Sequence, residues 1–270
     1  MRRSIILFSV ITLLAALPTS ATAEPTWAPA DQATVHPGVQ TFTDGSQCTA
    51  NFVFFDAADI YIGQAAHCAG TGGSTETDGC DSGSLPLDTP VEVDGASSPG
   101  TLVYSSWLTM QDNNENDSNT CAYNDFALIR LDPADHDVVN PSVPFYGGPT
   151  AVGATSALGE KVYSYGNSGL RFGIAQLSPK EGYSTGQSNG GWNHTVYTVT
   201  PGIPGDSGSA FLSAEGSALG TLSTVAILPL PASNGVGDLS RELVYAQQEG
   251  GFAGLQLALG TEEFLGGQLP

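Results

Sequence analysis

Three short segments carry side chains that together can break an amide bond. His67 lies in Ala-Ala-His-Cys, Asp125 opens Asp-Phe-Ala-Leu-Ile, and Ser207 lies in Gly-Asp-Ser-Gly-Ser. A serine hydroxyl is a weak nucleophile near neutral pH, but a neutral imidazole can accept its proton during attack. A carboxylate on the other ring nitrogen fixes the imidazole tautomer and stabilises the imidazolium that forms. These residue types predict catalysis with Ser207 as nucleophile, His67 as base and Asp125 as the group that orients it.

Taken singly, none of the three segments is specific. A His beside a Cys is often a core residue, an Asp before an apolar strand is an ordinary turn residue, and Gly-Asp-Ser-Gly also occurs in plain turns. Their combination in one chain is what favours catalysis. Glycines around Ser207 add to it, because they let the backbone turn tightly and aim N–H groups at one point. Such donors can hold a developing oxyanion.

The elements that must position these residues are predicted to be short β-strands. Runs rich in Val, Tyr, Thr and Phe alternate with Gly, Asp, Asn or Pro, and regularly spaced strands of this kind favour antiparallel sandwiches or barrels. A short C-terminal helix is predicted in the region Tyr245–Leu259, weakened by Gly250 and Gly251. The predicted strands are Ala50–Phe55, Asp59–Gln64, Pro90–Val93, Thr101–Leu108, Phe126–Leu131, Lys161–Tyr165, Gly173–Leu177, Thr195–Thr200, Ser209–Leu212, Ala218–Leu222 and Glu242–Ala246.

The chain begins with an export signal. Arg2 and Arg3 precede an apolar run that ends at Leu17, and Ala21-Thr22-Ala23 follows, which is the pattern of a cleaved secretory signal peptide. We therefore expect a secreted protein, with an uncleaved anchor as the alternative. The predicted segments are 1–23 (signal peptide), 24–40 (N-terminal arm or short pro-segment), 41–131 (first β half), 132–153 (connector) and 154–270 (second β half and C-terminal segment).

The charge balance limits the partners. The 270 residues include 7 Lys and Arg against 27 Asp and Glu, a net charge of −20. Binding a phosphate backbone requires cations, so nucleic acid is excluded as a partner, and an anionic membrane surface is disfavoured for the same reason. We expect a monomer with no cofactor and no membrane contact once the signal is removed.

The cysteines indicate disulfides. Cys48, Cys68, Cys80 and Cys121 are an even number in a chain predicted to enter an oxidising compartment, and their three pairings stay open at this point. Zinc is the alternative, but neither the cysteines nor the histidines have metal-ligand spacing, so no metal is predicted. The run Asp112–Asn119 offers oxygen ligands for calcium but lacks a recognisable loop template, and a solvated loop is favoured.

On its three motifs, the chain resembles the chymotrypsin-type, or trypsin-like, serine endopeptidases, including secreted bacterial members. The resemblance implies two antiparallel β-barrels with the catalytic groups between them, and hydrolysis of polypeptide substrates through an acyl-enzyme on Ser207. It implies that the backbone N–H groups of Gly205 and Ser207 form the oxyanion hole. It also implies a disulfide between Cys48 and Cys68 beside the His, which leaves Cys80 and Cys121 as a pair without a clear family counterpart.

The chain departs from the family pattern in three ways. Ser209 replaces a usual Gly, no cysteine lies near Ser207, and no Ile-Val-Gly-Gly start is visible. In the family, a new N-terminus starting with that sequence pairs with the acid before the nucleophile. Asp206 therefore needs another partner or an exposed setting, and Arg171 is one candidate cation.

The resemblance also implies the residues that contact substrate. Pro201 stands where the family has the base of its primary pocket, and Ser223, Thr224 and Val225 match the segment that pairs with the substrate backbone. Val225 and Leu243 are expected to narrow that pocket, which predicts a small or medium apolar residue before the scissile bond. The alternative is that Asp238 or Glu242 reaches the pocket and favours a basic residue.

Two other functions compete with a general endopeptidase. One is a catalytically inactive binding or adhesin module on the same fold, although all three catalytic residue types are present. The other is an esterase or a narrow processing protease that uses the same three groups.

Overall fold

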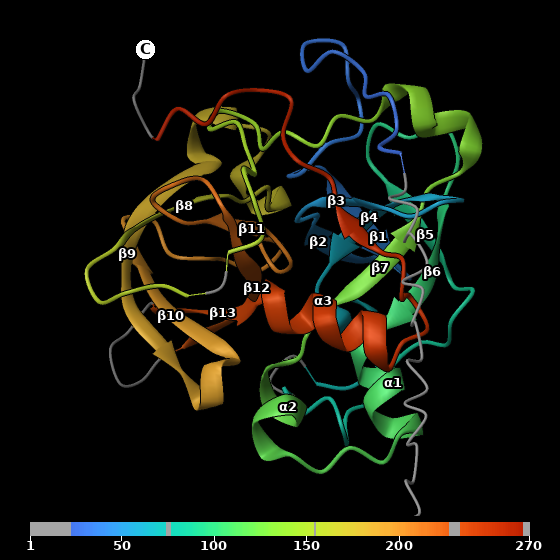
Figure 1. Ribbon diagram of the computed structural model, residues 1–270, viewed down its shortest axis with the longest axis vertical. Coiled ribbons are helices and arrows are strands. Elements are labelled where there is room, and N and C mark those ends of the chain that lie inside the picture. The colour runs from blue at the N-terminus through green and yellow to red at the C-terminus, as the bar shows by residue number, and fades with distance from the viewer. Residues whose placement is uncertain (1–22, 74–76, 154, 227–232, 267–270) are drawn as a thin grey trace, which may run out of the picture.

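Two antiparallel β units lie side by side in the computed structural model of this chain (Figure 1). The structure describes residues 23–73, 77–153, 155–226 and 233–266. Residues 1–22 of the predicted signal peptide lie outside this part, so the signal stays a prediction. Within the described ranges, every helix is too short or too polar to span a bilayer.

The first unit is an eight-stranded sheet in the order β14-β3-β4-β7-β6-β5-β1-β2. The edge strand β14 comes from the C-terminal part of the chain and pairs with β3, where Gln256 lies opposite Phe55. This pairing was not predicted. The C-terminal segment therefore links the second half of the chain to the first unit through backbone hydrogen bonds. The strands are β1 (Gln40–Thr43), β2 (Ser46–Thr49), β3 (Val53–Phe55), β4 (Ile60–Gln64), β5 (Pro90–Val93), β6 (Gly100–Ser105), β7 (Ala127–Arg130) and β14 (Gln256–Leu257).

The second unit is a closed barrel in the order β10-β13-β12-β11-β8-β9. Gly182 allows β9 to approach β10 closely, because a Cβ there would lie 1.9 Å from the Tyr197 carbonyl oxygen. The all-β prediction is confirmed, with the first unit left open at β2 and β14. The barrel strands are β8 (Lys161–Tyr165), β9 (Pro179–Ser188), β10 (Asn193–Thr198), β11 (Ala210–Leu212), β12 (Ala218–Ala226) and β13 (Ser233–Asp238).

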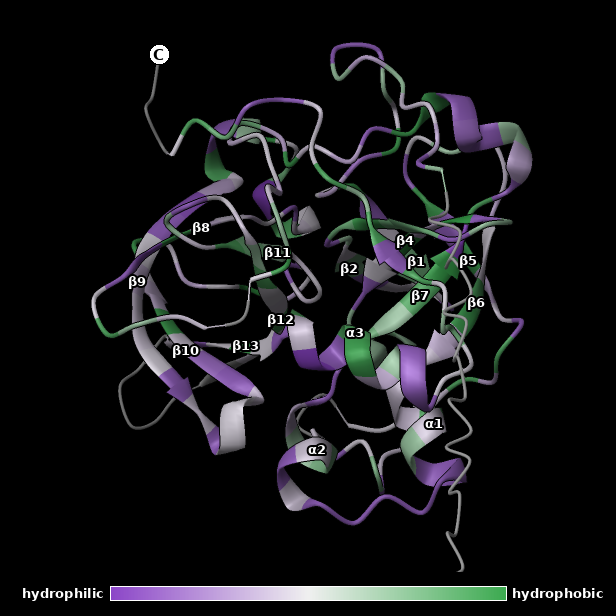
Figure 2. Cartoon of the chain, viewed as in Figure 1, coloured by the Kyte–Doolittle hydropathy of each residue, from purple (hydrophilic) through white to green (hydrophobic). Residues whose placement is uncertain are grey.

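Apolar side chains fill both units and the seam between them, as the hydropathy colouring of Figure 2 indicates along the strands. One cluster fills the first unit and includes Ile62 and Ile129. Another fills the second barrel around Phe211. A third joins residues of both units, such as Phe54 and Tyr163, to the C-terminal helix. Each fully buried side chain of this size stabilises the fold by about 1.5–3 kcal/mol relative to exposure, so the seam holds the two units in a fixed arrangement.

Helices appear where some strands were predicted. Of the three helices in the described residues, α1 (Ser106–Asp112) and α3 (Leu239–Gln248) overlap predicted strands, whereas α2 (Ser118–Tyr123) does not. The described residues also form five short 3₁₀ turns. The predicted strand Glu242–Ala246 is wrong, because it lies inside α3. The Asp238 carboxylate caps that helix by accepting from Arg241 N at 2.9 Å, so α3 begins earlier than the predicted helix. It ends before Gly250, as the glycine pair favours.

Two further strand predictions need correction. Gly173–Leu177 contains a 3₁₀ turn at Ala175–Leu177 in place of a strand, and Thr101–Leu108 is cut short where α1 begins. Residues 24–40, the predicted arm, pack on the predicted connector: Ala28 N donates to Val139 O at 2.9 Å, and Val35 forms a buried bridge with Val139. The segment boundaries themselves stay predictions.

Candidate active site

His67 lies on the 3₁₀ turn Ala66–Ala69 that follows β4, and its side chain is 26% exposed. The turn is anchored on both sides. Cys68 is bonded to Cys48 in β2, and the His67 backbone N–H donates to Asp125 Oδ1 at 2.8 Å. The imidazole is therefore held at the junction of the units with one edge toward solvent.

Asp125 lies in the loop between α2 and β7, and Ser106 fixes that loop. Ser106 Oγ donates to the Asn124 carbonyl at 2.8 Å and accepts from Phe126 N at 3.0 Å. Asp125 is 4% exposed, so its carboxylate faces the protein interior. This arrangement aims the carboxylate at the His67 turn.

The Asp125 carboxylate meets the imidazole directly. Its Oδ2 accepts from His67 Nδ1 and from Ser223 Oγ, each at 2.6 Å. Burial would raise the pKa of Asp125, but the charge and hydrogen bond of His67, with that of Ser223, hold it below its ordinary value. Burial would lower the pKa of His67, but Asp125 raises it above its ordinary value. The pair is thus built to stabilise an imidazolium that points its other nitrogen outward.

Ser207 sits in a tight turn across the cleft from His67. Gly205 has φ +94° and Gly208 has φ +87°, in the left-handed region that favours glycine. A Cβ at Gly208 would also lie 2.6 Å from the Thr49 carbonyl oxygen. No hydrogen bond joins Ser207 to His67 among the described residues, although both line the same cleft. Such contacts commonly tighten only when substrate binds.

The carbonyl groups of the two peptide units that precede Asp206 accept hydrogen bonds from side chains. The Pro204 carbonyl accepts from Ser168 Oγ at 2.5 Å, and the Gly205 carbonyl accepts from Thr49 Oγ1 at 2.7 Å and Gln47 Nε2 at 3.0 Å. Because a trans peptide points its N–H away from its carbonyl, the Gly205 N–H faces away from Ser168. Within the described ranges, the N–H groups of Gly205 and Ser207 have no acceptor, which is the arrangement an oxyanion hole requires.

Asp206 is buried and bound by two cations. Arg171 Nη2 lies 2.5 Å from Asp206 Oδ2, and Lys180 Nζ also donates to that oxygen. Burial would raise the pKa of Asp206, but these cations hold it below its ordinary value. Arg171 is thus placed where the sequence argument required a partner. Lys180 was missed, and the signal that could have found it is an inward position in the alternating strand β9.

The cleft that holds His67 and Ser207 has a volume of about 740 Å³. Ser223 and Thr224 line it, as expected, and the side chain of Val225 lies outside the described residues. Pro201 does not line it, but its carbonyl accepts from Lys180 Nζ at 3.3 Å. The other lining residues are Ser46, Gln47, Cys48, Gly70, Gly72, Gly73, Thr77, Trp107, Asp125, Gly202, Ile203, Pro204, Gly205 and Leu222.

Leu243 was wrongly placed in the pocket. It lies on α3, is 7% exposed, and packs in the apolar cluster between the two units. Asp238 is buried as the cap of α3, where its Oδ2 lies 2.8 Å from His194 Nε2. Glu242 is fully buried behind Asp125. Neither acid lines the described cleft.

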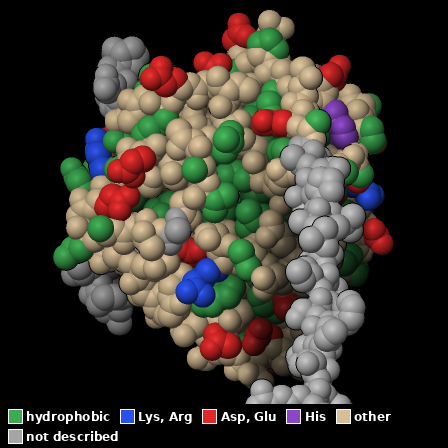
Figure 3. All heavy atoms as spheres, in the orientation of Figure 1, with side chains coloured by type: hydrophobic (Ala, Val, Ile, Leu, Met, Phe, Trp, Pro, Cys, Tyr) green, Lys and Arg blue, Asp and Glu red, His purple; other side chains and the backbone are tan. Residues whose placement is uncertain are grey.

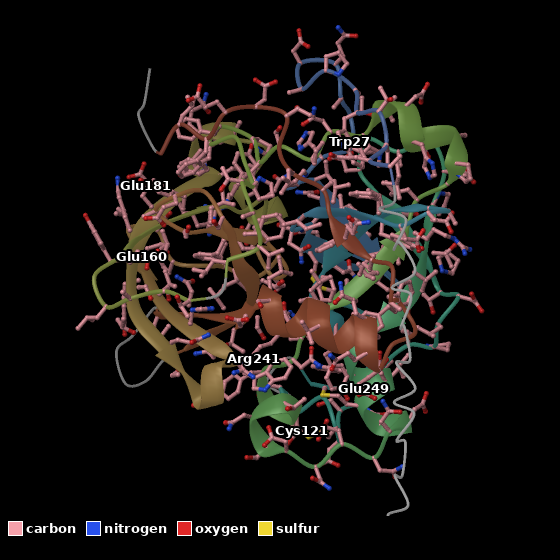
Figure 4. The ribbon with its side chains drawn as sticks, in the orientation of Figure 1. Trp27, Cys121, Glu160, Glu181, Arg241 and Glu249 are labelled. Atoms are coloured by element: carbon pink, nitrogen blue, oxygen red, sulfur yellow. A yellow bond between two sulfur atoms is a disulfide. The ribbon has the colours of Figure 1, made fainter. Side chains whose placement is uncertain are left out.

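Two disulfides lie near the site. They join Cys48 to Cys68 and Cys80 to Cys121, the latter across 41 residues and onto α2, where Figure 4 labels Cys121. The groups of possible metal ligands in the described residues consist largely of these bonded cysteines.

Acidic side chains are spread over the face shown in Figure 3, with few Lys and Arg.

No family model and no curated protein matches this chain. Among solved structures, Thermobifida fusca Protease A is similar at 18% identity and a TM-score of 0.50, over 84% of this chain and 100% of that one. A glutamic acid specific serine protease, described as using a histidine triad in substrate binding, is similar at 17% identity and 0.51, over 83% and 100%. A Glu endopeptidase is similar at 15% and 0.50, over 82% and 95%. The likeness confirms the predicted chymotrypsin-like two-barrel fold.

Proposed function

We propose that this chain is a secreted serine endopeptidase that cleaves peptide bonds through an acyl-enzyme on Ser207. The observation that carries the proposal is the Asp125 carboxylate, which binds both the backbone N–H and Nδ1 of His67 at the edge of a cleft shared with Ser207. The fold alone would also suit an inactive binding module. The buried Asp125 carboxylate orients the His67 imidazole, and this arrangement favours catalysis instead.

Each group has a defined step in this mechanism. Ser207 Oγ attacks the scissile carbonyl carbon while Nε2 of His67 takes its proton, and Asp125 stabilises the imidazolium. The N–H groups of Gly205 and Ser207 hold the oxyanion that forms. His67 then gives the proton to the leaving amine, and the C–N bond breaks. Water, deprotonated by His67, attacks the acyl-enzyme, releases the acid product and restores the Ser207 hydroxyl.

Reaction with a sulfonyl fluoride tests the proposal directly. We expect Ser207 Oγ of the folded protein to displace fluoride from the reagent and lose its proton, forming one sulfonyl ester, because only an activated serine reacts at neutral pH. Intact mass and peptide mapping would locate the label, with the unfolded protein as the control. A folded protein that stays unlabelled, or is labelled equally on other serines, would favour the inactive binding module.

We further propose a small or medium apolar residue before the scissile bond. Gly202, Ile203, Pro204 and Leu222 line the cleft, and the described lining contains no Lys or Arg and no His besides His67. Two similar structures are glutamate-specific by name, but a charged glutamate side chain that is buried in a pocket is normally paired with a cation.

A peptide library tests this preference. We expect kcat/KM for Ala, Val or Leu before the cleaved bond to exceed that for Glu, Lys or Arg by at least about tenfold, because an unpaired charge would be desolvated in the pocket. Among the apolar residues, one methylene more or less changes kcat/KM by about 1–3 kcal/mol, so the profile also reports the size of the pocket. Preferred cleavage after Glu or after Lys and Arg would refute the apolar pocket while leaving the protease mechanism intact.

A further inference from the structure

Glu242 is a buried acid that the mechanism above does not use. It lies on the inward face of α3 and is 0% exposed, whereas Arg241 on the same helix and Glu249 just after its last residue, both labelled in Figure 4, are exposed. Lys, Glu, Arg and Asp are almost never fully buried unless they are paired. Within the described residues, no Lys or Arg forms an ion pair with Glu242.

Glu242 lies directly behind the Asp125 backbone. Its Oε1 accepts from the Asp125 N–H at 3.4 Å, and its Oε2 lies 3.1 Å from Thr221 Oγ1. When the acid is neutral, its hydroxyl on Oε2 can donate to Thr221 Oγ1, so the carboxyl proton has an acceptor. Thr221 Oγ1 accepts in turn from Asn51 Nδ2 at 3.2 Å. These hydrogen bonds connect the first unit, β12 and α3, and they end at the backbone N–H of Asp125, the residue whose carboxylate orients His67.

The fold makes room for this carboxyl group. A Cβ at Gly237 would lie 2.3 Å from Glu242 Oε1, so the glycine in β13 is what lets the acid enter. The groups that face it are Asp125 from the loop before β7, Asp238 at the start of α3 and Tyr104 from β6. Burial, followed by the charge of Asp125, raises the pKa of Glu242 well above its ordinary value.

We propose that Glu242 is a positioning residue for Asp125 that acts as a neutral carboxylic acid. It holds the Asp125 backbone N–H without adding a second negative charge behind the carboxylate that orients His67. An ionised acid in this place would face two other carboxylates, and no Lys or Arg pairs with it among the described residues. The part of this proposal that concerns turnover rests on the proposed protease function.

The kinetic test compares Glu242→Gln, Glu242→Leu and the control Glu249→Gln. The leucine variant lacks an acceptor for the Asp125 N–H, and we expect about a tenfold lower kcat with KM nearly unchanged, because a misplaced catalytic group slows the chemical step. The glutamine variant keeps an acceptor oxygen and should recover most of that loss. Glu249→Gln, at the exposed end of α3, should match the wild type.

The pH profile separates a neutral from an ionised Glu242. If it is neutral, Glu242→Gln removes no charge, and the acid limb of kcat/KM, which reports His67, should stay within about 0.2 pH unit of the wild type. Removing a real negative charge this close to Asp125 and His67 would lower that limb by about one pH unit. A shift of that size would overturn the proposal.

Stability against pH tests the same point without any turnover. Glu242 has a raised pKa only when folded, so below its ordinary value of 4.5 both states hold the proton and the acid adds no pH dependence. Above that pH only the folded state keeps the proton, and the wild type loses stability until the folded pKa is passed. Relative to Glu242→Gln, its folding constant should fall by about tenfold per pH unit in this window.

Urea unfolding of the disulfide-intact protein between pH 4 and 8 would measure this difference. A stability gap between wild type and Glu242→Gln that is constant above pH 5.5 would mean an ionised Glu242 and would refute the proposal. Should the wild type show no hydrolysis at all, the protease function fails, whereas the unfolding experiment still decides the protonation of Glu242.

Discussion

Replacing Ser207 with alanine is expected to lower kcat by about 10⁴-fold or more while leaving the fold intact, because the nucleophile and its proton path are lost together. The substitution removes one oxygen that faces the cleft and forms no hydrogen bond among the described residues. Circular dichroism and thermal unfolding should therefore match the wild type. Turnover of a fluorogenic peptide, with kcat and KM separated, is the measurement.

Ser209 supplies a matched control for that experiment. It lies two residues further on, is 0% exposed, and its Oγ is buried without a hydrogen-bond partner. Ser209→Ala should change kcat little, since no reacting atom is lost. Hydrolysis that survives in purified Ser207→Ala, or that disappears equally in Ser209→Ala, would contradict the role assigned to Ser207.

The residues predicted to be catalytic were chosen from the sequence because each sits in a compact local motif. Gly205 and Gly208 flank Ser207 where positive φ is needed, so backbone chemistry and side-chain chemistry pointed to the same turn. The strands β5 and β8 were located with their observed bounds for a similar reason, since alternation and turn residues mark both ends.

The parts that were missed depend on tertiary contacts. The burial of Lys180 and Glu242 depends on partners that lie 26 and 117 residues away. The alternation of β9 points Lys180 inward but does not identify Asp206 as its partner, and Glu242 was considered only as an acid of the pocket. We predicted that Leu243 lies in the pocket because of its position in the chain. In the structure it lies on α3, and its side chain packs in the apolar cluster between the two units. A strand-like run of Glu242–Ala246 became helical because the Asp238 cap and the packing of α3 outweighed β propensity.

The ion pairs of Asp206 with Arg171 and Lys180 bear on how the protein matures. Both partners, Arg171 and Lys180, come from within the second half of the chain. They occupy the carboxylate that, in the resembled family, pairs with a newly cut N-terminus. We therefore infer that the turn carrying Gly205 and Ser207 forms without such a cut.

Replacing Asp206 with asparagine is expected to unfold or strongly destabilise this turn. The change leaves Lys180, 2% exposed, and Arg171, 8% exposed, as buried cations without their anion. Breaking a buried pair by removing one partner typically costs about 3–5 kcal/mol. Denaturant unfolding, with the midpoint and slope fitted separately, would measure the loss.

The same variant should also lose turnover beyond its loss of stability. Asp206 Oδ1 accepts from Ser168 N at 3.1 Å, and Ser168 in turn holds the Pro204 carbonyl that orients the Gly205 N–H. Losing one oxyanion donor costs about 10²–10³ in kcat, so a drop of that size is expected under conditions where the variant is still folded. Glu181→Gln, which breaks the partly exposed pair with Lys161, is the matched control and should leave both measurements nearly unchanged. An Asp206→Asn protein with wild-type stability and kcat would show that the ion pairs of Asp206 neither support the fold nor shape the oxyanion hole.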